Sequence, residues 1–289
     1  MTDYLVHIGI IISIQAILAL SLNLVIGEAG LLSVAQGAFY GIGAYGLALL
    51  MLDFHVNFFL AVALGMVGAG VGALIVGVVF SRFRGDYYAL GTIGFASIFY
   101  SVVLNLQDIT GGPLGLPGIP RPELGGISFF DNVSFLVLSL IALAFVYGVC
   151  RYLTASAFGR VLHGIREDEG ATAIFGYNPI HFKLAVFVIS AALSAIGGAL
   201  FASYFSYIDP SSFVLFESVF LIAVVVLGGL GSHEGAILGA VLLVVIPEAL
   251  RFVGFSADIA AQMRLLVYGV VLVLLMLYRP QGLLGRFRI

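Results

Sequence analysis

Residues 58–80 read FFLAVALGMVGAGVGALIVGVVF, a stretch without one polar side chain. Crossing the hydrocarbon core of a bilayer takes about 20 apolar residues, and only helices and closed barrels satisfy every backbone hydrogen-bonding group there. The stretch shows no alternation of apolar and polar residues, which a barrel strand would require. It therefore predicts a transmembrane helix and indicates that lipid surrounds this part of the chain.

Composition extends this interpretation to the whole chain. Of 289 residues, 62% are hydrophobic and only 9% are charged, whereas about a quarter of the residues of a soluble domain are charged. We expect an all-α, polytopic transmembrane helical bundle of about nine spans, in a single domain over residues 1–289. No positive residue precedes the first apolar run, so we expect a span there and not a cleaved signal peptide. The expected spans cover residues 5–26, 33–52, 58–80, 87–106, 134–151, 183–206, 215–230, 236–253 and 262–278.

The positive residues predict the orientation of the bundle, because short cytoplasmic loops are enriched in lysine and arginine. Most of them fall in segments that are cytoplasmic if the chain runs N-out, C-in. This topology leaves an extracytoplasmic loop over about 107–133 and a cytoplasmic loop over about 152–182. The inner residues are Arg82, Arg84, Arg151, Arg160, Arg166, Lys183, Arg279, Arg286 and Arg288, and the outer ones are Arg121, Arg251 and Arg264.

The cytoplasmic loop has the pattern of an amphipathic helix followed by a second short helix. Apolar residues recur at i, i+3, i+4 and i+7 from Phe158, and Arg160 and Glu167 fall on the opposite face. Gly176 is placed to end the second helix, and Asn178 to cap the next span. The pattern fits either a connector that rests on neighbouring spans or a docking element for a cytosolic protein.

Several spaced motifs make most of the chain resemble the LivM-type permeases of the branched-chain amino-acid ABC transporters. Gln36 departs from the family, which often has histidine there, and His163 stands where a basic residue is common. The motifs are Ser21-Leu22-Asn23-Leu24 with Gly27 and Gly30, Gly37-Ala38-Phe39 with Gly41-Ile42-Gly43-Ala44-Tyr45, Arg84-Gly85-Asp86-Tyr87-Tyr88-Ala89, Thr110-Gly111-Gly112 with Gly118-Ile119-Pro120, residues 159–169 with Gly176, residues 226–232, and Arg279-Pro280-Gln281-Gly282-Leu283.

The resemblance implies the permease subunit of an ATP-binding-cassette importer in the bacterial inner membrane. Such a subunit translocates branched-chain amino acids by alternating access, with other amino acids, urea or short amides as alternative solutes. The implied partners are a second, LivH-type permease subunit, two cytosolic ATPase subunits and a periplasmic solute-binding protein that carries most of the selectivity. Residues 159–169 are implied to be the coupling helix, inserted into a groove of an ATPase subunit. The implied coupling residues are Phe158, Gly159, Arg160, Leu162, His163, Ile165, Arg166, Glu167 and Asp168.

The chain lacks the sequence features of an enzyme. Its only lysine, Lys183, follows phenylalanine, so no phosphate-binding loop ending in Gly-Lys is present. No group of His, Cys or acidic residues has the spacing of metal ligands, and no cofactor is expected. The net charge is -3 and no basic cluster is present, so the sequence does not support binding to nucleic acid. Cys150 is expected to be an inert buried thiol. The main alternative function is that of a stand-alone secondary transporter or channel. Proteins of that class usually hold ionisable groups deep in the bilayer, whereas the acidic residues of this chain lie near the ends of the expected spans.

Two glycine-rich breaks are candidate hinges, and the polar beginning of one span is a candidate lining of the translocation path. Gly27 and Gly30 interrupt the first apolar run, and Gly228, Gly229 and Gly231 interrupt a late one, so both breaks are candidate hinges. The span after the first break begins with polar and aromatic residues that could line the translocation path. Hydrogen bonding between helices is the alternative role for them. These candidate path residues are Ser33, Gln36, Phe39 and Tyr40.

Overall fold

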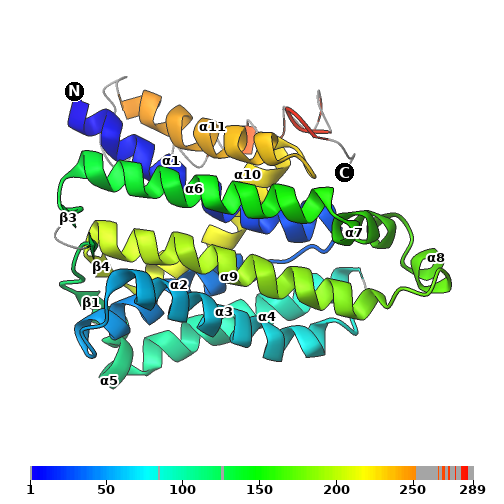
Figure 1. Cartoon of the computed structure of the whole chain (residues 1–289), viewed down its shortest axis with the longest axis horizontal. Coiled ribbons are helices and arrows are strands. Elements are labelled where there is room, and N and C mark those ends of the chain that lie inside the picture. The colour runs from blue at the N-terminus through cyan, green and yellow to red at the C-terminus, as the bar shows by residue number, and fades with distance from the viewer. Residues whose placement is uncertain are drawn as a thin grey trace.

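The computed structural model describes residues 2–83, 85–124, 127–251 and 281–285, with isolated positions between 266 and 277. Over these residues the chain is an all-α membrane bundle, as predicted (Figure 1). In chain order the elements are α1 Thr2–Asn23, the π-helix η1 Leu24–Glu28, α2 Gln36–Leu52, α3 Phe58–Phe80, α4 Asp86–Asn105, α5 Gln107–Thr110, the 3-10 helix η2 Gly112–Leu114, β1 Leu116–Pro117, β2 Glu123–Leu124, β3 Ile127–Ser128, α6 Asn132–Ala155, α7 Ala157–Glu167, α8 Glu169–Ile174, α9 Pro179–Phe205, β4 Tyr207–Ile208, the 3-10 helix η3 Pro210–Phe213, α10 Leu215–Gly228 and α11 His233–Arg251.

Five helices are long and apolar enough to cross a membrane, and they match five expected spans: Asp3–Glu28, Phe58–Phe80, Asp86–Asn105, Asn132–Ala155 and Pro179–Phe205. The span expected at 33–52 is the shorter helix α2, which begins later, at Gln36. Those expected at 215–230 and 236–253 are α10 and α11, which are bent by 119° at the break between them. The ninth, 262–278, lies outside the described residues apart from isolated positions. The count of nine stays a prediction.

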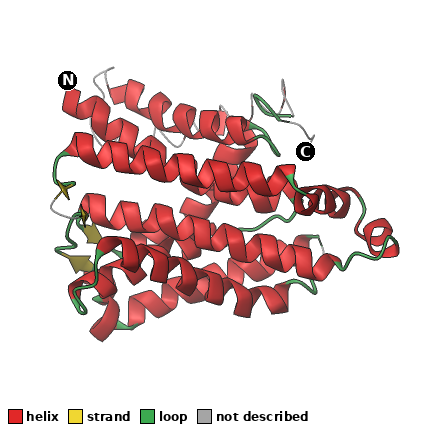
Figure 2. Ribbon diagram, viewed as in Figure 1, coloured by secondary structure: helices red, strands yellow, loops and turns green. Residues whose placement is uncertain are grey.

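The two ends of the bundle carry different structures (Figures 1 and 2). Helix α1 begins at the end that holds the short strands, where β1 pairs with β4 and β2 pairs with β3, both antiparallel. Helices α7 and α8 lie at the opposite end. The long loops 107–133 and 152–182 therefore lie at opposite ends, as the N-out, C-in topology requires. Which end faces the cytoplasm stays a prediction.

Non-helical backbone breaks the chain after the first span and between α10 and α11. Residues 29–35 follow η1 without helical structure although most of them are buried, and residues 229–232 separate α10 from α11. Lipid offers no hydrogen-bond partners, so the protein itself must satisfy the freed backbone groups. The hydroxyl of Thr92 accepts a hydrogen bond from the Val34 amide at 3.0 Å, and that of Ser218 accepts one from the Gly37 amide at 2.8 Å.

Helix α9 forms the centre of the bundle, in contact with α1, α2 and α3. Its backbone comes so close to α2 that a Cβ atom at Gly198 would overlap the Tyr40 carbonyl oxygen and lie 2.8 Å from the Ala44 amide nitrogen. In lipid, helices associate through such close packing because no hydrophobic effect drives them together. The α2–α9 contact therefore depends on the small residue at position 198.

We expect Gly198→Ala to lower the free energy of unfolding by about 1–3 kcal/mol, because the added methyl group meets backbone that cannot yield. Gly68→Ala is the matched control, since a Cβ there meets no atom within 4 Å. That variant should be neutral or slightly stabilising, because alanine favours helix more than glycine does. Thermal unfolding of the purified chain in detergent measures both. Equal stability of the two variants would contradict the packing described here.

Candidate functional site

Helix α7 lies across the end of the bundle with its apolar face turned inward. Ser156 caps the helix by accepting a hydrogen bond from the Phe158 amide at 3.1 Å. Val161, Leu162 and Ile165 are buried, so this face rests on the protein's own spans, as the connector interpretation expects. Gly159 is buried as well, because its Cα packs against the backbone of Thr154.

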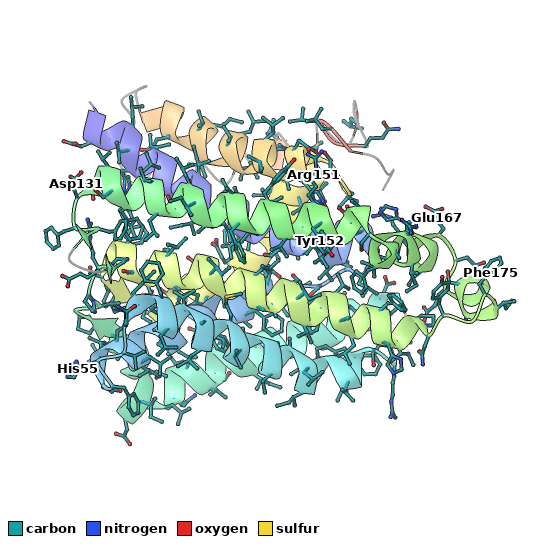
Figure 3. All side chains as sticks on the ribbon, viewed as in Figure 1. His55, Asp131, Arg151, Tyr152, Glu167 and Phe175 are labelled. Atoms are coloured by element: carbon teal, nitrogen blue, oxygen red, sulfur yellow. The ribbon has the colours of Figure 1, made fainter. Side chains whose placement is uncertain are left out.

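The second short helix, α8, extends away from the bundle. Asp168 caps it by accepting a hydrogen bond from the Ala171 amide at 2.9 Å, and Glu169 pairs with Lys183 of α9 at 2.6 Å. Ile174, the last residue of α8, is 87% exposed, and Phe175, in the turn that follows, is 81% exposed. Figure 3 shows Phe175 at the tip, farther out than Glu167 of α7.

The predicted coupling residues therefore divide into three groups. Arg160, Glu167 and Asp168 are exposed, whereas Gly159, Leu162 and Ile165 are buried. The partly buried members, Phe158, His163 and Arg166, face other elements of the same chain: Phe158 stacks on Phe182, and the other two contact the end of the first span.

Arg166 and His163 connect α7 to the break in the first span. The Arg166 guanidinium donates to the carbonyl oxygens of Ile26, at 3.3 Å, and Gly27. Burial lowers the pKa of Arg166, and the carboxylates of Glu28 and Glu167 counteract this effect. His163 contacts the Glu28 carboxylate. The carbonyl oxygens of Ile26 and Gly27 lie at the C-terminal end of a helix, where a positive charge such as that of Arg166 is favourable.

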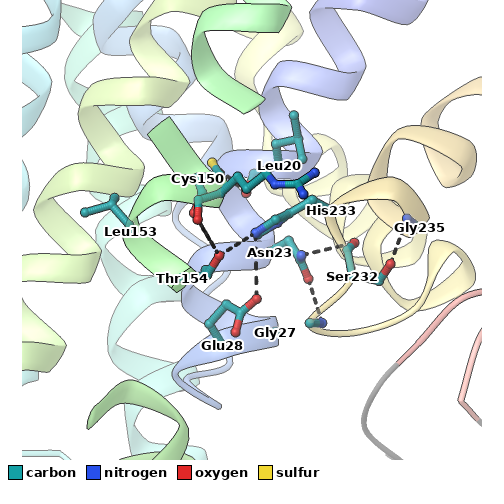
Figure 4. A network of polar contacts seen from close by, with 12 residues as sticks. Leu20, Asn23, Gly27, Glu28, Cys150, Leu153, Thr154, Ser232, His233 and Gly235 are labelled. Carbon is teal, nitrogen blue, oxygen red and sulfur yellow. Dashed lines mark hydrogen bonds and ion pairs between the residues drawn. The ribbon is translucent and has the colours of Figure 1, made fainter. Parts of the chain in front are cut away.

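The two predicted hinges meet at the same place (Figure 4). The side chain of Asn23 accepts a hydrogen bond from the Gly231 amide at 3.1 Å and donates one to the Ser232 carbonyl oxygen at 3.3 Å. Gly27 packs so closely that a Cβ there would lie 2.6 Å from the Gly231 amide nitrogen. Gly30, with a φ of 70°, leaves room for the side chain of Arg166.

The late break depends on glycine for its conformation. Gly229 has a φ of 113° and Gly231 a φ of 72°, which side chains rarely adopt. Gly228 packs against the backbone of Gly235, where no Cβ would fit. His233 then opens α11, with its Nε2 atom 3.0 Å from the Thr154 hydroxyl of α6. The structure thus brings α7, both glycine breaks and α6 together. We call this assembly the cytoplasmic junction, after the side on which the predicted orientation places it: Asn23, Gly27, Glu28, Thr154, His163, Arg166, Gly231, Ser232 and His233.

The predicted path residues form a separate, buried group. Ser33 and Gln36 are each 2% exposed, Phe39 1% and Tyr40 2%. The Gln36 amide donates to the Ser21 hydroxyl at 2.6 Å, which is the interhelical bonding that the alternative role expects. Phe39 packs on Phe187, and Tyr40 on Phe201 and Phe213. Their role in the path stays a prediction.

Sequence reasoning missed a polar stripe on the outer face of α4. Ser97, Ser101 and Asn105 are exposed and line an open hollow of about 510 Å³ together with Ile98, Val102 and Leu106. Their spacing at i, i+4 and i+8 puts them on one face of the helix. That spacing inside an apolar span is the signal that could have identified the stripe.

Comparison with known proteins agrees with this architecture. Residues 4–276 match the family model described as branched-chain amino acid transport system, permease component. The chain is 39% identical to the high-affinity branched-chain amino acid transport system permease protein LivM of Salmonella typhimurium, over 98% of this chain and 70% of that protein. It is 38% identical to LivM of Escherichia coli, with the same coverage.

A second group of relatives carries a different name. The chain is 29% identical to the high-affinity branched-chain amino acid transport system permease protein LivH of Escherichia coli, over 95% of this chain and 92% of that protein. No solved structure matches the chain significantly. On the extent of the family match and of the LivM identity, the chain belongs to the family of branched-chain amino acid transport system permease components.

Proposed function

We propose that the chain is the membrane-spanning permease subunit of an ATP-binding-cassette importer for branched-chain amino acids, in the bacterial inner membrane. The names of its relatives support the solute class. The observation that carries the proposal is the amphipathic unit α7–α8, which rests on α6, α9 and η1 and extends beyond the bundle. A related amino acid, urea or a short amide is the alternative solute.

The proposed partners are a LivH-type permease, two cytosolic ATPases and a periplasmic solute-binding protein. Relatives named LivM and LivH both align along nearly the whole chain, which supports a pair of similar permeases. ATP hydrolysis is assigned to other subunits, since the chain has a single lysine and no phosphate-binding loop.

We place the docking surface on the exposed part of α7 and on the tip formed by the end of α8 and the turn after it. The apolar face of α7 is buried against its own spans and does not offer a contact to a partner. Ile174 and Phe175 provide apolar anchors at the tip, and Arg160, Glu167 and Asp168 provide a polar rim. A buried apolar centre with a polar rim is the usual composition of a protein interface.

The proposed mechanism is alternating access. Closure of the ATPases displaces α7 and α8, and the cytoplasmic junction carries this displacement to the breaks of the first span and of the α10–α11 pair. Both breaks contain glycines at positive φ, which allow backbone rotation at low cost. The spans then rock between outward-open and inward-open states.

Phe175→Ser should lower ATP-driven uptake by about tenfold or more, because an aromatic anchor at an interface contributes about 2 kcal/mol of binding energy. Phe54→Ser is the control, since Phe54 is 72% exposed in the connection between α2 and α3, far from α8. Radiolabelled solute uptake and co-purification of the ATPase subunits measure the effect. Full uptake and full retention of the ATPases in Phe175→Ser would contradict the docking assignment.

The polar stripe of α4 supports a second element of the proposal, the position of the solute path. Hydroxyl and amide groups that faced lipid would find no hydrogen-bond partner there. Beside a solute, they could form the hydrogen bonds that water makes to the solute outside the membrane. On its inner side α4 contacts the first break through Thr92, so movement at the break could reposition the stripe. We propose that α4 borders the solute path, next to the partner permease.

A cysteine at Ser97 should therefore react with a membrane-impermeant thiol reagent in the assembled importer. Val71→Cys is the matched control, because Val71 is 50% exposed on α3 at a similar depth and should face lipid. The native Cys150 is buried and is replaced by serine in both variants. Solute should slow the labelling of Ser97→Cys. Equal labelling of both variants would contradict a path along α4.

A further inference from the structure

The cytoplasmic junction contains a buried carboxylate, Glu28, which the docking proposal does not use. Glu28 ends η1 and is 1% exposed. A carboxylate at the C-terminal end of a helix is disfavoured by the helix dipole, and a buried charge is costly unless it is paired. Its position therefore requires compensation from other elements.

Two histidines from separate elements provide that compensation. His163 of α7 contacts one carboxylate oxygen of Glu28, Oε2. The Nε2 atom of His233 lies 4.0 Å from the other oxygen, Oε1. His233 is the first residue of α11, so this side chain connects the start of that helix to the carboxylate. Arg166, whose guanidinium binds the neighbouring Gly27 carbonyl, is the nearby fixed positive charge.

Glu28 thus contacts the moving parts of the proposed mechanism at one point. It belongs to the break of the first span, His163 belongs to α7, and His233 follows the break between α10 and α11. Through Thr154, His233 is also held to α6. Among the described residues, Oε1 of Glu28 has no hydrogen-bond partner, so its 4.0 Å approach to Nε2 of His233 is an electrostatic contact and not a hydrogen bond.

We propose that Glu28 is a positioning residue that ties α7 to both broken spans, so that α7, η1 and the start of α11 move as one unit. This inference rests on the proposed function, because it concerns how the stroke of the ATPases reaches the spans. Without the charge on Glu28, α7 and the first break, still joined through Arg166, would move without carrying the start of α11 with them.

Glu28→Gln removes the charge and keeps the shape of the side chain. In the complete importer, reconstituted with its ATPases and binding protein, we expect ATP hydrolysis to continue while solute imported per ATP falls about tenfold, as for the loss of a charge-assisted interaction. Glu234→Gln is the matched control, because Glu234 is exposed, follows His233 directly and contacts Tyr147 at 2.7 Å. Its ratio should equal that of the wild type.

A distance measurement separates positioning from general loss of structure. Spin labels at Ala157 of α7 and Leu238 of α11, both exposed, report the separation of the two helices. In the wild type this distance should stay constant through the ATP cycle, and in Glu28→Gln it should change when ATP binds. A wild-type distance that changes with ATP would overturn the proposal.

The ratio gives the other decisive outcomes. An unchanged ratio in Glu28→Gln, or equal losses of import and hydrolysis, would overturn the proposal. If Glu28→Gln does not assemble, His163→Gln tests the same contact, because His163 is the less buried of the two partners. An unchanged ratio of solute imported per ATP in His163→Gln would also overturn the proposal. Failure of the proposed function would look different, since the wild type itself would then show no ATP-dependent import.

Discussion

The structure depends on one constraint: a backbone that leaves the helix inside a membrane must find its hydrogen bonds within the protein. The helical backbone is broken at residues 29–35, after the first span, and at residues 229–232, between α10 and α11. Side chains from other elements satisfy the freed groups, among them Asn23, Thr92, Ser218 and Arg166. Because those side chains come from α1, α4, α10 and α7, the breaks are the points at which distant elements are joined. Unbroken helices packed by small residues would offer no such connection.

This constraint explains why the candidate moving parts coincide. The positive φ angles of Gly30, Gly229 and Gly231 allow the backbone to turn, and the absence of side chains lets the two breaks approach each other. Helix α7 then closes the end of the bundle, with its apolar face on the spans and Arg166 on the open carbonyl groups. A partner that displaces α7 acts directly on the end of the first span, where the helical hydrogen bonding stops.

The sequence predicted the elements better than their contacts. Apolar run length predicted the spans such as 58–80, because a bilayer sets a length that can be counted. Periodicity predicted α7, but not which way its apolar face points, since Val161 and Leu162 could equally have met a partner. The path residues Gln36 and Tyr40 were chosen for their chemistry, and only the packing of α2 on α9 shows that they are buried. Glu28 and His233 are far apart in the chain, so no local pattern could reveal that they meet.

The central claim is that this chain provides a conduit whose movement is driven from outside, through α7 and α8. Solute uptake into proteoliposomes tests it most directly, with the chain alone or together with the second permease, the ATPases and the binding protein. We predict uphill accumulation only in the complete assembly, and only with ATP. Accumulation by the chain alone, driven by a proton or sodium gradient, would contradict the account.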